Sequence, residues 1–108
     1  MAFSPDGRLL AVTVSDKVSL WEVSTGFDIR TFVAHRMHIT GIAFSPDGTL
    51  LATSGQDNVI HLWEAATAQE LMTLEGHTDV VSDVTFSQDG KWIVSSSWDG
   101  TVRLWGVK

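Results

Sequence analysis

The feature that most constrains the fold is a ten-residue phrase that occurs three times. It reads FSPDGRLLAV at the start of the chain, FSPDGTLLAT from Phe44 and FSQDGKWIVS from Phe86. Three tryptophans follow the same spacing, because Trp21, Trp63 and Trp105 are separated by 42 residues each. A period of about 40–45 residues is typical of a unit of four short strands that buries its core only by stacking on a neighbour.

Within each repeat unit the apolar residues alternate with a period of two. The segments ITGIAFS and VVSDVTFS place Ile42 with Phe44, and Val84 with Phe86, on one face of a strand. The next residues, SPDG or SQDG, end that strand. Proline presets φ, aspartate bonds nearby backbone groups, and a glycine such as Gly48 accepts the positive φ of a tight turn. Each unit is therefore predicted to be a run of short antiparallel strands joined by tight turns.

One segment carries conflicting signals. EAATAQELMTL is rich in alanine, glutamate and leucine, and its propensity alone favours a helix. The matching stretch of the first unit, EVSTGFDIRTF, has a turn at Gly26 followed by strand-like alternation. We therefore predict a fourth strand over Gln69 to Leu74, although Ala68 stands where the sister turn has its glycine.

The order of these motifs resembles the WD-repeat family of β-propellers. Gly-His, a V-x-F strand, S-P-D-G, L-A-T or I-V-S, an aspartate and Leu-Trp follow one another, and the resemblance covers essentially the whole chain. Two complete stretches are present, from Ala34-His35 to Trp63 and from Gly76-His77 to Trp105. The dipeptide that names the family reads Trp-Glu, Trp-Glu and Trp-Gly here, and Trp98-Asp99 spells it only at a turn.

The resemblance implies an all-β fold, a partial β-propeller made of four-stranded antiparallel blades. We expect one domain over 1–108, with an incomplete blade at 1–33, a complete repeat at 34–75 and an incomplete repeat at 76–108. Propellers close with about four to eight blades, so one copy cannot close a ring. The chain is expected to belong to a larger propeller or to form a homo-oligomer.

The resemblance also implies a buried hydrogen-bond network inside each complete unit. In proteins of this family an aspartate, a histidine, a hydroxyl and the tryptophan are linked within one blade. The two expected networks are His35, Thr53, Asp57 and Trp63, and His77, Ser95, Asp99 and Trp105. The first unit has Val12 at the hydroxyl position and no upstream histidine, so no network is expected around Asp16 and Trp21.

The same residue types could be interpreted as a hydrolase triad, in which histidine activates the hydroxyl and aspartate orients the histidine. A network whose donors and acceptors are all paired leaves no free nucleophile. A structural device also recurs once per blade, whereas a catalytic centre occurs once per protein. His35, His38 and His61 could be imagined as a metal cluster, but no suitable fourth ligand recurs. We therefore expect no enzyme activity, no cofactor and no metal site.

Two further tryptophans lie outside the repeat signature. Trp92 occupies the strand position of Leu9 and Leu50, and it is predicted to be a core residue. Trp98 lies in a turn, opposite Gln56 of the preceding unit, where strand packing does not require an aromatic side chain. Trp98 and Gln56 are therefore candidates for partner binding. The alternative is that Trp98 packs on a neighbouring blade.

Charge and composition narrow the partners. Thirteen acidic against seven basic residues give a net charge of −6, which repels phosphate backbones and anionic lipid. Neither nucleic acid nor a membrane is therefore expected as a partner. The sequence has no cysteine, no basic leader and no long apolar run, which favours a cytoplasmic location. The expected function is a non-catalytic scaffold that binds proteins or peptides. The alternative is a purely structural fragment, natural or engineered, that builds a ring from its own copies.

Overall fold

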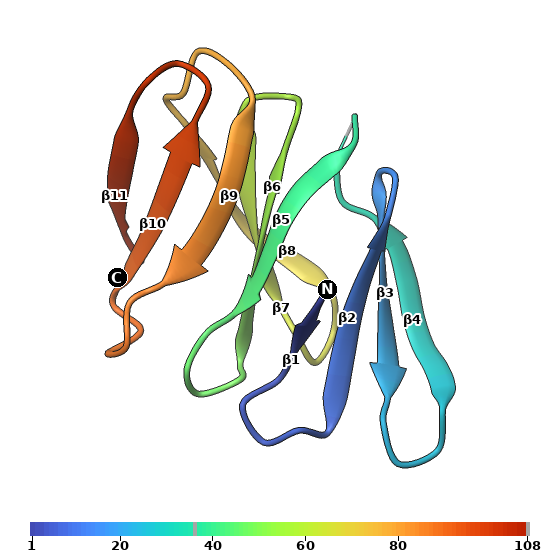
Figure 1. Cartoon of the computed structure of the whole chain (residues 1–108). Helices are drawn as coiled ribbons and strands as arrows, with labels where there is room; N and C mark the ends of the chain where they lie inside the picture. Colours follow the sequence, from blue (N-terminus) through green and yellow to red (C-terminus); the bar gives the residue numbers. More distant parts are fainter. Residues whose placement is uncertain (36, 108) are drawn as a thin grey trace.

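A computed structural model describes residues 1–35 and 37–107 of the chain. These residues form β-strands arranged in three antiparallel sheets (Figure 1). The first sheet contains β1 (Ala2–Phe3), β2 (Leu9–Val14), β3 (Lys17–Glu22) and β4 (Phe27–Val33). The second contains β5 (Ile39–Phe44), β6 (Leu50–Gly55), β7 (Val59–Glu64) and β8 (Gln69–Glu75). The third contains β9 (Val81–Phe86), β10 (Trp92–Ser97) and β11 (Val102–Gly106).

In each sheet the strands lie side by side in the order of the sequence, as expected for a blade made of consecutive hairpins. The sheets stand next to one another, and their first strands, β1, β5 and β9, are neighbours in space (Figure 1). The predicted all-β, four-stranded antiparallel architecture is confirmed. Within the described ranges, no helix is long and apolar enough to span a bilayer.

The segment with conflicting signals forms a strand, as predicted. β8 pairs with β7 along its whole length, and the turn before it matches the turn of the first sheet. Ala68 has φ of 60° where Gly26 has 71°, and each donates its backbone N–H to a glutamate carbonyl at 2.8 Å. Turn geometry and pairing with β7 therefore override the helix propensity of this segment, although alanine pays a steric cost in the left-handed region.

The turns between the first and second strands share one design. In the second sheet, the Ser45 hydroxyl donates to Asp47 Oδ1 at 2.7 Å, and the Thr49 backbone N–H donates to the same oxygen at 3.0 Å. Ser4 with Asp6, and Ser87 with Asp89, repeat the serine–aspartate bond at 2.6 Å in the other two sheets. The aspartate of the motif therefore holds the turn that its glycine permits.

This turn makes a pH-dependent prediction. Hydrogen bonds from Ser45 and Thr49 lower the pKa of Asp47 to about 2, from an ordinary value of 3.8. Since the folded pKa is depressed, the stabilisation from Asp47 is complete above pH 3.8 and is lost as the pH falls towards 2. Replacing Ser45 by alanine is expected to raise the Asp47 pKa towards 3.8, measured by NMR titration of the carboxyl carbon. Ser87→Ala is the matched control, because it should raise the pKa of Asp89 instead. An Asp47 pKa that is the same in Ser45→Ala as in the parent chain would contradict the assignment.

The hydrophobic core lies between adjacent sheets. Two clusters of buried residues account for it. The first joins the first and second sheets and contains Ala11, Val18, Leu20, Ala34, Leu51 and Trp63. The second joins the second and third sheets and contains Ala52, Ile60, Leu62, Val81, Val84 and Ile93. Each sheet therefore depends on its neighbour to remove apolar surface from water.

The prediction that Trp92 is a core residue is wrong. Its side chain is 46% exposed, although it occupies the strand position of Leu50 as expected. Leu50 packs on the second cluster because the third sheet covers it. No sheet of the described residues covers the corresponding face of the third sheet, so Trp92 remains in contact with solvent.

Candidate functional site

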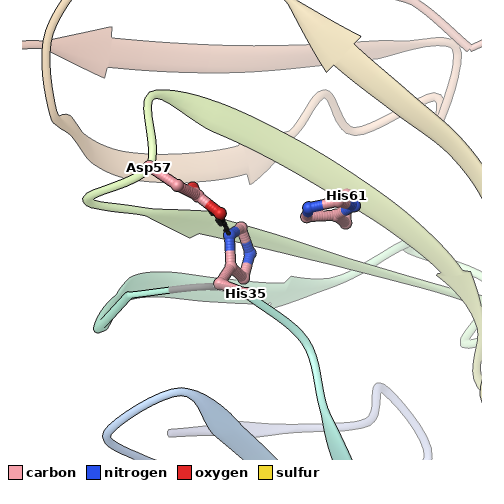
Figure 2. Close-up of side chains that lie close together, drawn as sticks. All are labelled: His35, Asp57 and His61. Carbon is pink, nitrogen blue, oxygen red and sulfur yellow. Dashed lines mark hydrogen bonds and ion pairs between the residues drawn. The ribbon is translucent and has the colours of Figure 1, made fainter.

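The second sheet contains a chain of hydrogen bonds that links four side chains. His35 lies in the connection between β4 and β5, Thr53 on β6, Asp57 in the turn after β6 and Trp63 on β7. His35 Nδ1 lies 2.9 Å from Asp57 Oδ1, a contact drawn in Figure 2. His35 Nε2 lies 2.7 Å from Thr53 Oγ1, which accepts the Trp63 indole N–H at 3.0 Å. The structure thus brings together the four residues that the sequence grouped.

The chemistry of the four groups defines the protonation state of His35. Burial lowers the pKa of His35 below its ordinary value, against the opposing effect of the Asp57 carboxylate. The neutral ring then carries its proton on Nδ1, because a carboxylate can only accept. Nε2 accepts from the Thr53 hydroxyl, whose oxygen accepts from Trp63. Each donor in this chain therefore has an acceptor.

The third sheet contains an equivalent chain of bonds. His77 Nδ1 lies 2.9 Å from Asp99 Oδ2, and His77 Nε2 lies 2.7 Å from Ser95 Oγ. The Trp105 indole N–H donates to Ser95 Oγ at 2.8 Å. Asp99 also accepts from the hydroxyl of Thr101, and this bond lowers the pKa of its carboxyl below the ordinary value. This network therefore ties the β10–β11 turn to the strands beneath it.

The first sheet has no such chain. Val12 stands at the hydroxyl position, and in the described part of the molecule neither the Asp16 carboxylate nor the Trp21 indole N–H makes a hydrogen bond. The carbonyl of Asp16 instead accepts the backbone N–H of Ala34 at 2.9 Å. The molecule therefore offers one sheet without the network as an internal comparison.

The hydroxyls of the two networks are closed to any substrate. Thr53 and Ser95 are fully buried, and each bonds both a histidine and a tryptophan. A nucleophile must reach a reacting atom at about 3 Å, which these packed oxygens cannot do. The geometry therefore supports a structural role for these side chains.

His61 adds a polar cluster that sequence reasoning missed. Its ring lies edge-on to His35 with 4.5 Å between centroids, and its Nδ1 lies 2.5 Å from Glu70 Oε1 on β8. Pairing between β7 and β8 creates this contact, and nothing in the repeat pattern marks it. At the same position the third sheet has Arg103, which lies over the Trp105 ring at 5.7 Å. The second network therefore has an extra titratable group that the third lacks.

The metal grouping considered from the sequence is altered by the fold. Possible ligand atoms of His35, Asp57 and His61 lie within 4.8 Å of one another (Figure 2), and His38 is not part of this group. Both ring nitrogens of His35 already form hydrogen bonds, to Asp57 and to Thr53. Ligation through His35 would break one of them in a buried site, so the donor set fits a hydrogen-bond network better than a metal centre.

The two candidates for partner binding occupy equivalent turns. The Gln56 backbone N–H donates to the His38 carbonyl at 3.0 Å, and the Trp98 backbone N–H donates to the Val80 carbonyl at 2.9 Å. Gln56 is half-buried, whereas Trp98 is 68% exposed. The Trp98 indole is therefore not packed on another sheet of this chain.

Comparisons with known proteins agree with this architecture. The family model described as WD40: WD domain, G-beta repeat, matches residues 26–64 and 68–106. No curated protein matches the chain in sequence. Two similar solved structures are described as the structure of U3-55K and the crystal structure of RRP9 WD40 repeats. Both have a TM-score of 0.94, with sequence identities of 29% and 30% respectively. Each alignment covers 97% of this chain and 34% of the other, so the chain spans about a third of the length of these proteins.

Proposed function

The chain belongs to the WD40 repeat family, a known type of protein-interaction scaffold, and from that premise we propose that it binds a protein or peptide without catalysing a reaction. The observation that carries the proposal is the exposed indole of Trp98 on a turn held by hydrogen bonds. Tryptophan is enriched among the residues that contribute most to binding at protein interfaces. Gln56, in the equivalent turn of the second sheet, supplies an amide on the same side of the molecule.

The Trp98 turn is rigid enough to act as a preformed anchor. The Ser97 backbone N–H donates to the Thr101 carbonyl at 3.1 Å, and the Gly100 N–H donates to the Ser97 carbonyl at 3.2 Å. Asp99 holds the same turn through the Thr101 backbone N–H at 2.9 Å and through its bond to the His77 ring. A preformed anchor loses little conformational entropy on binding, so more of the contact energy appears as affinity.

Electrostatics favour a protein partner over nucleic acid or a lipid surface. The net charge of −6 opposes association with phosphate groups. The exposed indole offers a large apolar contact with a polar N–H at its edge, which suits a peptide carrying both apolar and carbonyl groups. This function needs no cofactor and no metal.

The proposal can be tested with peptides selected from a random display library panned against the chain. Replacing Trp98 by alanine is expected to weaken the selected peptides at least about tenfold, the usual effect of removing an interface tryptophan. Phe27→Ala is the matched control, because this aromatic side chain is 72% exposed on the distant outer strand β4. Titration by fluorescence anisotropy of labelled peptides gives both affinities.

Equal affinities for Trp98→Ala and Phe27→Ala would overturn the assignment of this surface. A peptide set that binds the parent chain and loses affinity in Trp98→Ala alone supports it. Gln56→Ala is expected to have a smaller effect, because its side chain is half-buried and contributes less contact area.

A further inference from the structure

The third sheet exposes an apolar face that is built like two buried ones. Val94, Val102 and Leu104 point from β10 and β11, and the last two are 66% and 65% exposed. Moving back by one and two repeats leads to two sets of buried residues. These are Ala52, Ile60 and Leu62 in the second sheet and Ala11, Val18 and Leu20 in the first. Each of those sets packs on the next sheet of the chain.

The register of the strands shows that the three sets are structurally equivalent. Ala11 pairs with Leu20, Ala52 with Leu62, and Val94 with Leu104, across the second and third strands of each sheet. These two-residue pairs therefore occupy the same place on the same face of each sheet. The exposed face of the third sheet is an inter-sheet surface whose partner sheet is absent.

The first sheet carries the opposite surface. Leu10 pairs with Trp21 as Leu51 pairs with Trp63, and Leu51 and Trp63 are the residues on which the first sheet packs. Phe3 corresponds in the repeat to Phe44, which packs on the same cluster, yet Phe3 is 61% exposed.

The turns at one edge of the sheets repeat the same asymmetry. Pro5 of the first sheet lies against the turn at Gly48, and Pro46 of the second lies against Gly90. A side chain placed at Gly7 would meet nothing within 4 Å. The first sheet therefore has every element of the receiving surface and no neighbour in contact with it.

We propose that two copies of this chain associate head to tail, with the Phe3, Leu10 and Trp21 face of one copy packed on the Val94, Val102 and Leu104 face of the other. The partner is a second copy because both halves of the interface are present on each molecule and both match internal interfaces in register. Such an interface is heterologous, and it closes into a ring only if the rotation permits. Two copies supply about six sheets and three supply about nine, so two copies fall within the usual four to eight blades.

Light scattering of the unmodified chain at micromolar concentration tests the association. The expected mass is twice that of the 11.8 kDa chain, with dissociation on dilution. A folded species of 11.8 kDa across the whole concentration range would overturn the proposal.

Charged substitutions on the two faces test the geometry. Leu104→Asp and Phe3→Asp are each expected to give a folded monomer, because both side chains are largely exposed within one copy. Phe27→Asp is the control at an equally exposed aromatic outside either face, and it should leave the dimer intact. Circular dichroism of each variant establishes that it is folded.

Mixing separates head-to-tail association from a symmetric dimer. Immobilised Leu104→Asp retains an intact first-sheet face, and Phe3→Asp retains an intact third-sheet face. Immobilised Leu104→Asp should therefore capture Phe3→Asp but not a second molecule of Leu104→Asp. Capture of neither variant, or dimerisation of Leu104→Asp by itself, would contradict the head-to-tail arrangement.

Discussion

Replacing Ile60 by alanine is expected to lower the free energy of unfolding by about 2–5 kcal/mol, the range for truncating a large aliphatic residue in a core. Ile60 has no exposed surface and packs in the cluster between the second and third sheets. It lies on β7, which is paired on one side with β6 and on the other with β8. Strands held on both sides cannot easily move to fill the space, so most of the cavity should remain.

Ile29→Ala is the matched control for this prediction. The same side chain is removed, but Ile29 lies half-exposed on the outer strand β4. Urea denaturation of both variants, with equal m-values, compares the two costs directly. A loss of less than about 1 kcal/mol for Ile60→Ala would mean that the sheets repack, and that the inter-sheet core is looser than its burial indicates.

Replacing Asp57 by alanine is expected to lower the free energy of unfolding by about 1–3 kcal/mol, because a buried donor loses its acceptor. The His35 side chain is completely buried, and its Nδ1–H points at the Asp57 carboxylate at 2.9 Å. Without that acceptor the ring must keep an unpaired N–H or change tautomer. The other tautomer would put its proton on Nε2, which the Thr53 hydroxyl currently bonds.

The first sheet provides the control for Asp57→Ala. Asp16 occupies the equivalent turn, and its sheet has no histidine–hydroxyl–tryptophan chain. Asp16→Ala is therefore expected to change stability by less than about 0.5 kcal/mol, as is usual for surface substitutions. Thermal or urea denaturation monitored by tryptophan fluorescence measures both. Equal costs for the two variants would show that the aspartate acts through its turn and not through the histidine.

Local patterns in the sequence predicted the strands and the turns. The segment at β8 is the clearest example, because its composition favours a helix and only the comparison with the first unit indicated a strand. The serine and aspartate of each tight turn bond locally, over two to five residues, so their role could be read from the order of residues. The members of the two hydrogen-bond networks were grouped by resemblance to a family, and their distances came only from the structure.

Exposure of the end sheets could not be predicted from the sequence. Trp92 occupies the strand position of Leu50, and Val102 that of Ile60, yet Leu50 and Ile60 are covered and Trp92 and Val102 are not. Repeat position determines which face of a strand a side chain occupies, because alternation is a local property of the backbone. Burial requires another sheet to lie against that face.

The contact between His61 and Glu70 likewise exists only because β7 and β8 pair in a particular register. A bond from the Thr40 hydroxyl to the Val81 carbonyl also joins two sheets and has no counterpart in the repeated motif. By itself the sequence determined the repeat, the strands, the turns and the direction of each strand side chain, since these depend on neighbours along the chain. The tertiary structure decided which of those side chains meet water, a polar partner or another sheet, since that depends on segments brought together only by folding.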